Sequence, residues 1–477
     1  TTTGTIDAAD NNTGVGVDVF AALTSGDDNV AIGKSALTAN TTGYDNVAVG
    51  SSSLLANTTG RRNTAVGRLS MIANTTGNFN SAFGYNAGTA ITEGTSNTAV
   101  GDSALKANTT ASNNTAVGQA ALVANTTGTQ NVAVGATALD ANTTASYNTA
   151  VGYTALGLNT TGAENAAFGT EALNSNTTGA RNTGLGGYAG QSNTTASNNT
   201  SVGYLALYSN TTGPQNVAIG SGALQTQTTS EYNTAVGYRA GYVITTGLQN
   251  TYIGGQAGYA STTGNFNTAL GINALGSNTT GASNVAIGSG ALQSTTPTTT
   301  GSNNIGIGSN VRCKQGSHSG GIIIGDNIEA YATNSFTFGT SAQGFVTNQF
   351  SANANWARPS DERLKQDIQN DTLGLNFIND LRTVTYRWKG NNEIPENFMG
   401  YQEENVKDTS VVMHGMIAQE VKTALDTASV STFAGWDADD TTGQQMLSTE
   451  MFVYPLIKAV QELSAKVEEL ENKLKEK

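Results

Sequence analysis

The sequence predicts a mainly β protein, in which a parallel β-solenoid or β-roll is followed by a small α+β domain that ends in a helix. Three observations support this fold class. An asparagine recurs every 17 residues over residues 1–308, and a glycine follows each of these asparagines at a fixed distance. Residues 1–308 contain only 19 charged residues, whereas the shorter segment 309–477 contains 38 and has a near-normal globular composition.

The repeat begins at an anchor asparagine, which recurs from Asn12 to Asn284 in seventeen units without a slip. A three-residue insertion near Pro297 delays the next anchor to Asn304. The consensus is N-[VT]-A-[VI]-G-x-x-A-L-x-x-N-T-T-G-x-x. We expect a five-residue strand in which the large apolar third residue after the anchor is buried and the small second residue is close-packed. The glycine should end the strand, where positive φ or close backbone approach is expected.

Seventeen residues without a 3.6-residue period favour one coil of a solenoid over a pair of helices. A second short segment carries alanine and leucine, as at Ala36 and Leu37, and the NTTG corner then turns the chain. Stacked coils would place equivalent Asn and Thr side chains in ladders. One coil buries only about three medium side chains, so we expect an exposed apolar stripe that identical chains cover by associating.

The strand motif N-x-[AV]-[IV]-G resembles the head repeats of trimeric autotransporter adhesins. This resemblance implies a left-handed parallel β-roll packed as a homotrimer. The usual unit of that family is shorter than 17 residues, so the resemblance covers the strand motif better than the NTTG corner.

The C-terminal part divides into a predicted β transition segment, 309–351, and a predicted domain, 352–477. The transition segment is rich in Gly and Ser and has strand-like runs at 321–325 and 335–339. The domain contains SDERLK at 360–365, HGMIAQEV at 414–421 and a predicted helix at 449–477. Apolar residues in this helix alternate spacings of four and three, which predicts a coiled-coil seam. The seam comprises Leu456, Val460, Leu463, Val467, Leu470 and Leu474.

These three motifs resemble the intramolecular chaperone domain of phage endosialidases, tail spikes and tail fibres, an autoprocessing serine peptidase family. The resemblance covers about residues 352–477. It implies a chaperone domain that drives trimerisation of the preceding fibre through a trimeric coiled coil. It also implies that the domain then cuts itself off immediately before Ser360.

The residues around Ser360 suit this chemistry. A serine hydroxyl needs an adjacent base, and Lys365 is the candidate, giving a Ser/Lys dyad. Ser360 would attack the carbonyl of Pro359, and hydrolysis of the ester would yield residues 1–359 and 360–477. The candidate supporting residues are Asp361, Arg363 and His414. In the alternative interpretation Ser360 caps a helix, Lys365 lies on its surface and His414 is structural.

Other side chains form weaker patterns. Cys313 and His318 could meet their copies on a three-fold axis, but C-x-x-x-x-H alone is weak, so we predict no metal and no cofactor. Asp28 and Asp45 are expected to be solvated turn residues and not a hydrolase pair.

Two features of the repeat itself have alternative explanations. Asn-Thr-Thr occurs eleven times, and each copy is formally a glycosylation sequon, although a turn that needs these residues explains it without glycans. Stacked pairs such as Thr41 and Thr42 could form an ice-binding face, but the attached chaperone motifs favour a fibre.

The net charge and the hydropathy of the chain argue against two classes of partner, nucleic acids and membranes. The net charge is −13, which disfavours nucleic acid, and no run of 18 apolar residues is present to span a membrane. We therefore predict a homotrimeric phage tail fibre or bacterial surface adhesin, located on the virion or extracellularly at the cell surface. A phage-encoded fibre would assemble in a reducing compartment.

The predicted partner of the fibre is a host-cell surface glycan or protein receptor. The alternatives are a polysaccharide-degrading tail spike and a structural spacer whose binding part lies upstream. Tyrosines cluster in the later coils, where they could stack on sugars or fill contacts between chains. They are Tyr153, Tyr188, Tyr204, Tyr238, Tyr242 and Tyr259.

Overall fold

A computed structural model describes most of the chain, in two compact units, Thr1–Pro359 and Ser360–Lys477. The described residues are 11–293, 300–330, 332–342, 344–349, 362, 365–398, 401, 403–405, 408–439 and 442–476. The predicted domain boundaries at 308 and 352 stay predictions.

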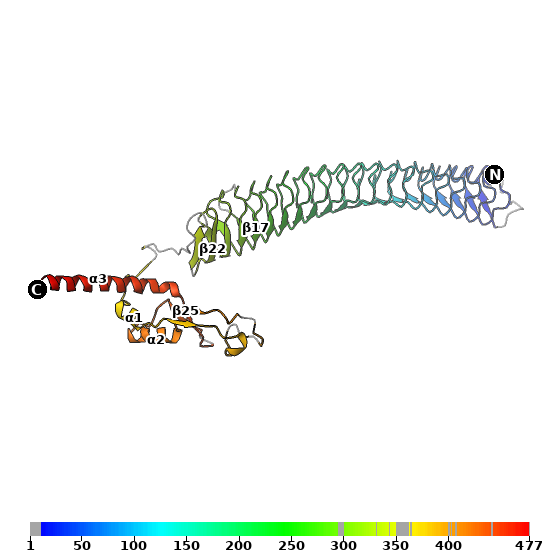
Figure 1. Cartoon of the computed structure of the whole chain (residues 1–477). Coiled ribbons are helices and arrows are strands. Elements are labelled where there is room, and N and C mark those ends of the chain that lie inside the picture. The colour runs from blue at the N-terminus through cyan, green and yellow to red at the C-terminus, as the bar shows by residue number, and fades with distance from the viewer. Residues whose placement is uncertain are drawn as a thin grey trace. The chain divides into compact units, whose positions relative to one another are not determined.

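Unit 1 is a parallel β-solenoid with a repeat of about 17 residues, which confirms the predicted fold class (Figure 1). Its short strands stack in one 21-stranded sheet. The strands are β1 (Thr13–Val15), β2 (Val30–Ile32), β3 (Val47–Val49), β4 (Thr64–Val66), β5 (Ser81–Phe83), β6 (Thr98–Val100), β7 (Thr115–Val117), β8 (Val132–Val134), β9 (Thr149–Val151), β10 (Ala166–Phe168), β11 (Thr183–Leu185), β12 (Thr200–Val202), β13 (Val217–Ile219), β14 (Thr234–Val236), β15 (Thr251–Ile253), β16 (Thr268–Leu270), β17 (Val285–Ile287), β18 (Ile305–Ile307), β20 (Ile322–Asp326), β22 (Ser335–Thr340) and β23 (Gly344–Gln349).

The C-terminal end of this sheet differs from the rest. Strand β23 pairs antiparallel with β22, whereas the other pairings of the sheet are parallel. A second, two-stranded sheet joins β19 (Arg312–Cys313) to β21 (Glu329–Ala330). An antiparallel strand covers the exposed edge that a stack of parallel coils would otherwise present.

The strands are shorter than predicted, and the predicted burial of the large third residue is wrong. Each repeat strand has three residues, and from β2 to β18 its middle residue, such as Ala48, is buried. The third residue faces outward, as in Ile32 and Phe83, whose exposed fractions are 40% and 41%. Side chains alternate across a strand, so the middle residue alone of the three points into the coil. Leucines from the facing turn, such as Leu54, fill the remaining space.

The alanine–leucine segment is a turn with left-handed residues. Leu37 has a φ of 50° and Ser35 a φ of 57°, and the pattern recurs in most coils. A left-handed residue other than glycine costs about 1–2 kcal/mol. Full burial of the leucine side chain, worth about 1.5–3 kcal/mol, offsets that cost. Glycine replaces the leucine in four coils, at Gly88, Gly190, Gly241 and Gly258, with φ near 60°.

The glycine after each strand is required by the close approach of the next coil. Gly118 has a φ of 139°, and a Cβ built on it would lie 2.3 Å from the carbonyl oxygen of Gly135. No side chain fits that distance, which explains why glycine recurs at this position.

Two buried asparagine ladders run along the stack and confirm the predicted ladders. In the first, Asn46 donates to the Oδ1 of Asn29 from its backbone N–H at 3.0 Å and from its Nδ2 at 3.1 Å. In the second, the Nδ2 of Asn57 donates to the Oδ1 of Asn40 at 2.7 Å. A threonine ladder lies beside them, as where Thr41 donates through its Oγ1 to the next coil. Most buried asparagines of the thin coil are thereby hydrogen-bonded. The exceptions in the described coils are the Oδ1 atoms of Asn74 and Asn210, which are buried without a hydrogen-bond partner where Ile91 and Gln227 interrupt the second ladder.

Unit 2 is a small α+β unit around one cluster of apolar side chains. Its elements are α1 (Leu375–Asp380), β24 (Val384–Tyr386), η2 (Asn391–Glu393), β25 (Met413–Gly415), α2 (Ala418–Thr427), β26 (Trp436–Ala438), β27 (Gln445–Leu447), η3 (Thr449–Phe452) and α3 (Val453–Lys475). The core residues are Leu373, Phe377, Val421, Ala424, Leu425 and Phe452. The HGMIAQEV motif spans β25 and the start of α2, so its Val421 enters this core.

Helix α3 has two distinct faces. Pro455 and Ala459 are buried. On the same side, Glu462 accepts a 2.8 Å hydrogen bond from the backbone N–H of Leu375, at the start of α1. The predicted coiled-coil seam lies on another face and is exposed, with Val467 at 47% and Leu474 at 77% as the extremes. The α-helix starts at Val453, because residues 449–452 form a 3-10 turn.

Candidate functional site

Most of the predicted self-cleavage site lies outside the described residues. This holds for Pro359, Ser360, Asp361 and Arg363. Lys365 is described: its side chain is exposed, and its backbone N–H donates to the carbonyl oxygen of Glu362 at 3.0 Å. The proposed dyad therefore stays a prediction.

His414 lies on an exposed strand of unit 2. It sits on β25, opposite Thr385 of the antiparallel strand β24. The two strands line a surface pocket of about 670 Å³, which also includes Met416. Met416 packs against the apolar core of the unit. The HGMIAQEV motif thus connects the exposed His414 to the apolar core of unit 2. The proposed role of His414 in supporting self-cleavage stays a prediction.

An ion pair that sequence inspection missed joins α2 to the segment after α1. The Nε of Arg382 donates to Glu420 at 3.0 Å, and an Nη of Arg382 donates to the other carboxylate oxygen. The hydrogen bond from Arg382 lowers the pKa of Glu420. The two residues are 38 positions apart, so no local sequence pattern could have identified the pair.

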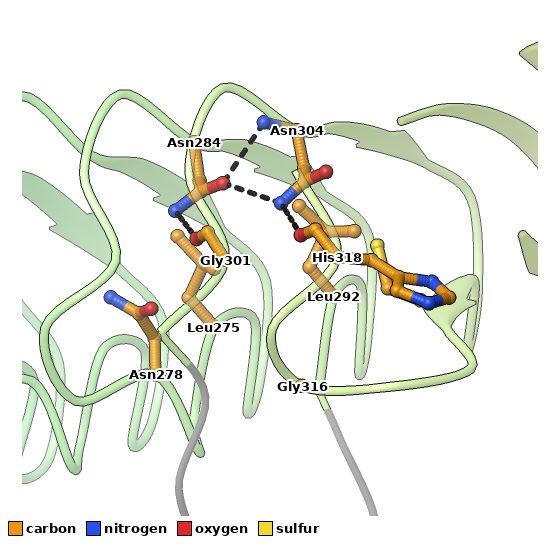
Figure 2. Close-up of a pocket in the computed structure, with 9 residues that line it drawn as sticks. Leu275, Asn278, Asn284, Leu292, Gly301, Asn304, Gly316 and His318 are labelled. Atoms are coloured by element: carbon orange, nitrogen blue, oxygen red, sulfur yellow. Dashed lines mark hydrogen bonds between the residues drawn. The ribbon is translucent and has the colours of Figure 1, made fainter. Parts of the chain in front are cut away.

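Cys313 and His318 line one small cavity at the C-terminal end of the solenoid, as Figure 2 shows. The cavity volume is about 20 Å³, which is room for about one water molecule. The backbone oxygen of His318 accepts a hydrogen bond from the Nδ2 of Asn304 at 2.9 Å. His318 thus supplies the carbonyl that a glycine such as Gly60 supplies to the first asparagine ladder in other coils. Burial raises the pKa of Cys313 to about 11. Within the described ranges, no three His, Cys, Asp or Glu side chains lie together as a metal site.

The asparagines of the eleven Asn-Thr-Thr sequons are buried in the solenoid. Asn125, for example, donates through its Nδ2 to Asn108 at 3.0 Å and to the Gly128 carbonyl at 2.9 Å. A glycan cannot be attached to an amide in this position, so the sequons are explained by the ladder. Asp28 and Asp45 are exposed turn residues, and Asp45 lies 3.4 Å from Arg62.

The exposed third residues of the strands form one continuous apolar column. Strand register places Val15 beside Ile32 and continues, coil by coil, to Phe338. Leu185 and Leu270 are 47% and 45% exposed, and the valines of the column are half-buried or exposed. The predicted apolar stripe is therefore present. It consists of the third residues after the anchor asparagines, which the sequence pattern predicts to be buried inside the coil.

No helix in the described parts of the chain is both long and apolar enough to cross a bilayer.

Comparison with protein families finds a match in the N-terminal part of unit 2. The family model described as Chaperone of endosialidase matches residues 360–429. The match begins at Ser360 and includes the HGMIAQEV motif. No curated protein and no solved structure matches the chain. The segment that is similar to the chaperone of endosialidase therefore lies C-terminal to the long repeat region.

Proposed function

We propose that the chain is a subunit of a homotrimeric attachment fibre of the phage tail-fibre or tail-spike type, carried on the virion. The C-terminal domain assembles the fibre and then releases itself. The observation that carries this proposal is the apolar column, which runs along unit 1 from Val15 to Phe338.

A column of this length calls for a partner with the same repeat. Exposed apolar patches on soluble monomers rarely exceed a few hundred Å². A second copy of the solenoid presents Val, Ile, Leu and Phe at the same coil spacing. Parallel chains can therefore match the column coil by coil, as identical subunits do around a symmetry axis.

A regular repeat creates a register problem that a separate domain can solve. If one solenoid slips along its neighbour by one coil, the new contacts are nearly the same as the old ones, apart from those of one coil. The apolar column alone therefore specifies register weakly. A chaperone domain that joins the chains at one end would align every coil behind it.

The exposed seam of α3 is the surface through which the domain would join the chains. Its spacing places Val460 and Val467 at a positions and Leu463 and Leu470 at d positions. In isolated coiled coils this choice favours two strands, so the helix does not by itself specify three. We take the number three from the resemblance to endosialidase chaperones, together with the solenoid's resemblance to trimeric adhesin heads.

Self-cleavage is proposed as a single turnover in cis. The Oγ of Ser360 attacks the carbonyl carbon of Pro359, the C–N bond breaks, and an ester and a free amine form. Water then hydrolyses the ester, which leaves a carboxylate on Pro359. Lys365 is the proposed base that takes the hydroxyl proton.

One observation supports this proposal, and a second one bears on when cleavage would occur. The scissile bond coincides with the boundary between the two compact units, so cleavage leaves the contacts within each unit intact. Lys365 is exposed in the single chain, whereas a catalytic base needs a protected site. We therefore expect neighbouring chains to complete the site, so that cleavage follows assembly.

Intact-mass measurements on the wild type and on Ser360→Ala test the release step. We expect the wild type to yield fragments 1–359 and 360–477 and the variant to stay whole. Lys365→Ala should also stay whole, while Lys458→Ala, which changes a lysine on α3, should be cut normally. A wild type that remains intact after assembly would refute self-cleavage and leave the domain as a permanent cap.

A further inference from the structure

One corner of the solenoid carries tyrosines in four of five successive coils of its C-terminal half. The corner consists of the fifth, sixth and ninth residues after each anchor asparagine. In the coils that begin at Asn182, Asn199, Asn233 and Asn250 these positions hold six tyrosines, here called the tyrosine belt. They are Tyr188, Tyr204, Tyr208, Tyr238, Tyr242 and Tyr259.

The rings of the belt support one another. Tyr242 and Tyr259 are stacked, with centroids 5.3 Å apart and planes 2° from parallel. Tyr188 and Tyr204 meet edge to face at 6.0 Å. The guanidinium of Arg239 lies 5.1 Å from the Tyr238 centroid and 5.0 Å from the Tyr242 centroid. These contacts restrict the rings before any ligand arrives, which lowers the entropic cost of binding.

Two tyrosines of the belt are exposed, the other four are half-buried, and polar groups lie beside them. Tyr204 and Tyr238 are 55% and 53% exposed. Small residues occupy the neighbouring corner positions, and a Cβ built on Gly255 would meet no atom within 4 Å. Glutamines and an arginine share the corner with the tyrosines, and the Nε2 of Gln191 donates a hydrogen bond to the carboxylate of Glu171 in the coil before the belt. The polar residues are Gln191, Gln225, Arg239 and Gln256.

The same corner in other coils indicates that it faces solvent and not a neighbouring subunit. At the fifth position the N-terminal coils carry Lys34, Arg68 and Asp102, all exposed. A contact between chains that runs along the whole solenoid would bury these charges without a partner. The apolar column lies instead on the strand, two residues before the corner begins. The belt is therefore a local feature on an otherwise solvated corner.

We infer that the tyrosine belt is a binding site for an oligosaccharide. The C–H faces of sugar rings pack on aromatic rings, and sugar hydroxyls take hydrogen bonds from phenol, amide and guanidinium groups. A surface that combines exposed, mutually supported tyrosines with Gln and Arg offers both kinds of contact. The inference rests on the proposed attachment function, and it names the class of receptor and the place where it binds.

The experiment measures binding of the full-length protein to an array of neutral and acidic oligosaccharides. The test variant combines Tyr204→Ala, Tyr238→Ala and Tyr242→Ala. The matched control combines Tyr85→Ala and Tyr153→Ala, which occupy the same fifth position outside the belt and are 44% and 58% exposed. We expect the wild type to bind at least one oligosaccharide. The belt variant should weaken that binding by about tenfold or more, and the control should change it by less than about twofold.

Sedimentation of the same samples separates this inference from the proposed function. A wild type that binds no oligosaccharide, or a belt variant that binds as the wild type does, would overturn the inference. A belt variant that dissociates would also overturn it, because the tyrosines would then belong to the interface between chains. A wild type that is monomeric yet binds sugar through the belt would contradict the trimer and leave the inference standing.

Discussion

The hydroxyl of Tyr252 donates a hydrogen bond to the Oγ of Ser261, 2.9 Å away, inside a coil whose equivalents hold alanine and asparagine at these positions. Burial raises the pKa of Tyr252 to about 12. The ring fits because glycine replaces leucine at Gly241 and Gly258. A Cβ built on Gly258 would lie 2.5 Å from the ring. Four departures from the consensus, at Tyr252, Ser261, Gly241 and Gly258, thus compensate one another.

This compensation predicts coupled effects of substitution. Tyr252→Ala should leave a cavity and cost about 3–5 kcal/mol of local stability. Gly258→Leu alone should be destabilising because of the clash with the ring. The double variant, Tyr252→Ala with Gly258→Leu, restores the consensus alanine and leucine. Its loss of stability should therefore be smaller than the sum of the losses in the two single variants. Hydrogen exchange of residues 250–278 reports local stability, and strictly additive effects would contradict the packing described.

The second asparagine ladder should be required for stability. Asn125 donates two hydrogen bonds and accepts a third from the Nδ2 of Asn142 at 2.9 Å. Asn125→Ala leaves buried partners unmatched and should cost about 1–3 kcal/mol. Thr127→Ala, an exposed change in the same corner, serves as the control. Urea unfolding followed by circular dichroism measures both, and equal midpoints would argue against the ladder's role.

The half-buried thiol of Cys313 gives a pH-dependent signal. Because the pKa of Cys313 is raised to about 11 in the folded chain, its alkylation by iodoacetamide should stay slow at pH 8 and rise through pH 11. In urea, where the chain is unfolded, the alkylation rate should rise at a lower pH, near the ordinary pKa of a thiol. The unfolded chain therefore releases this proton first, so folding stability should fall as the pH increases between these values. A native-state rise near pH 9 would show that the thiol is exposed.

The Arg382–Glu420 pair should contribute to the acid stability of unit 2. The hydrogen bond from Arg382 lowers the pKa of Glu420, so its contribution is present above the unfolded carboxyl pKa and is lost as the pH falls through the folded value. Glu420→Gln should therefore weaken unit 2 at pH 7 and leave it unchanged at strongly acidic pH. Thermal unfolding at both pH values measures this. A deficit that persists in acid would indicate a packing effect.

The spacing of Asn and Gly was sufficient to predict the coil length, the parallel stack and the ladders, because a fixed period forces equivalent atoms into register. The outward orientation of Ile32 and its equivalents was not predictable from a rule that assigns large apolar residues to the interior of a single chain. Leu37 in a left-handed turn lacks any turn signature, since leucine rarely adopts that conformation and does so here because the coil buries it.

The site in unit 2 was less accessible to prediction than the solenoid. The motif around His414 identifies the domain, yet the strand pairing with Thr385 depends on a contact between distant segments. The same holds for Arg382 and Glu420. Lys365 follows Ser360 in sequence and its side chain is exposed, but Ser360 itself lies outside the described residues.

The mass of the assembled Ser360→Ala protein in solution tests the central claim most directly, because this variant keeps the chain whole. Sedimentation velocity should give three times the 48.8 kDa mass of the chain. Adding Ile219→Asp and Ile253→Asp, which place charges on the apolar column, should shift the mass toward one chain. Leu158→Asp, at an exposed leucine off the column, should leave it unchanged. A single-chain mass for Ser360→Ala itself would contradict the trimeric fibre.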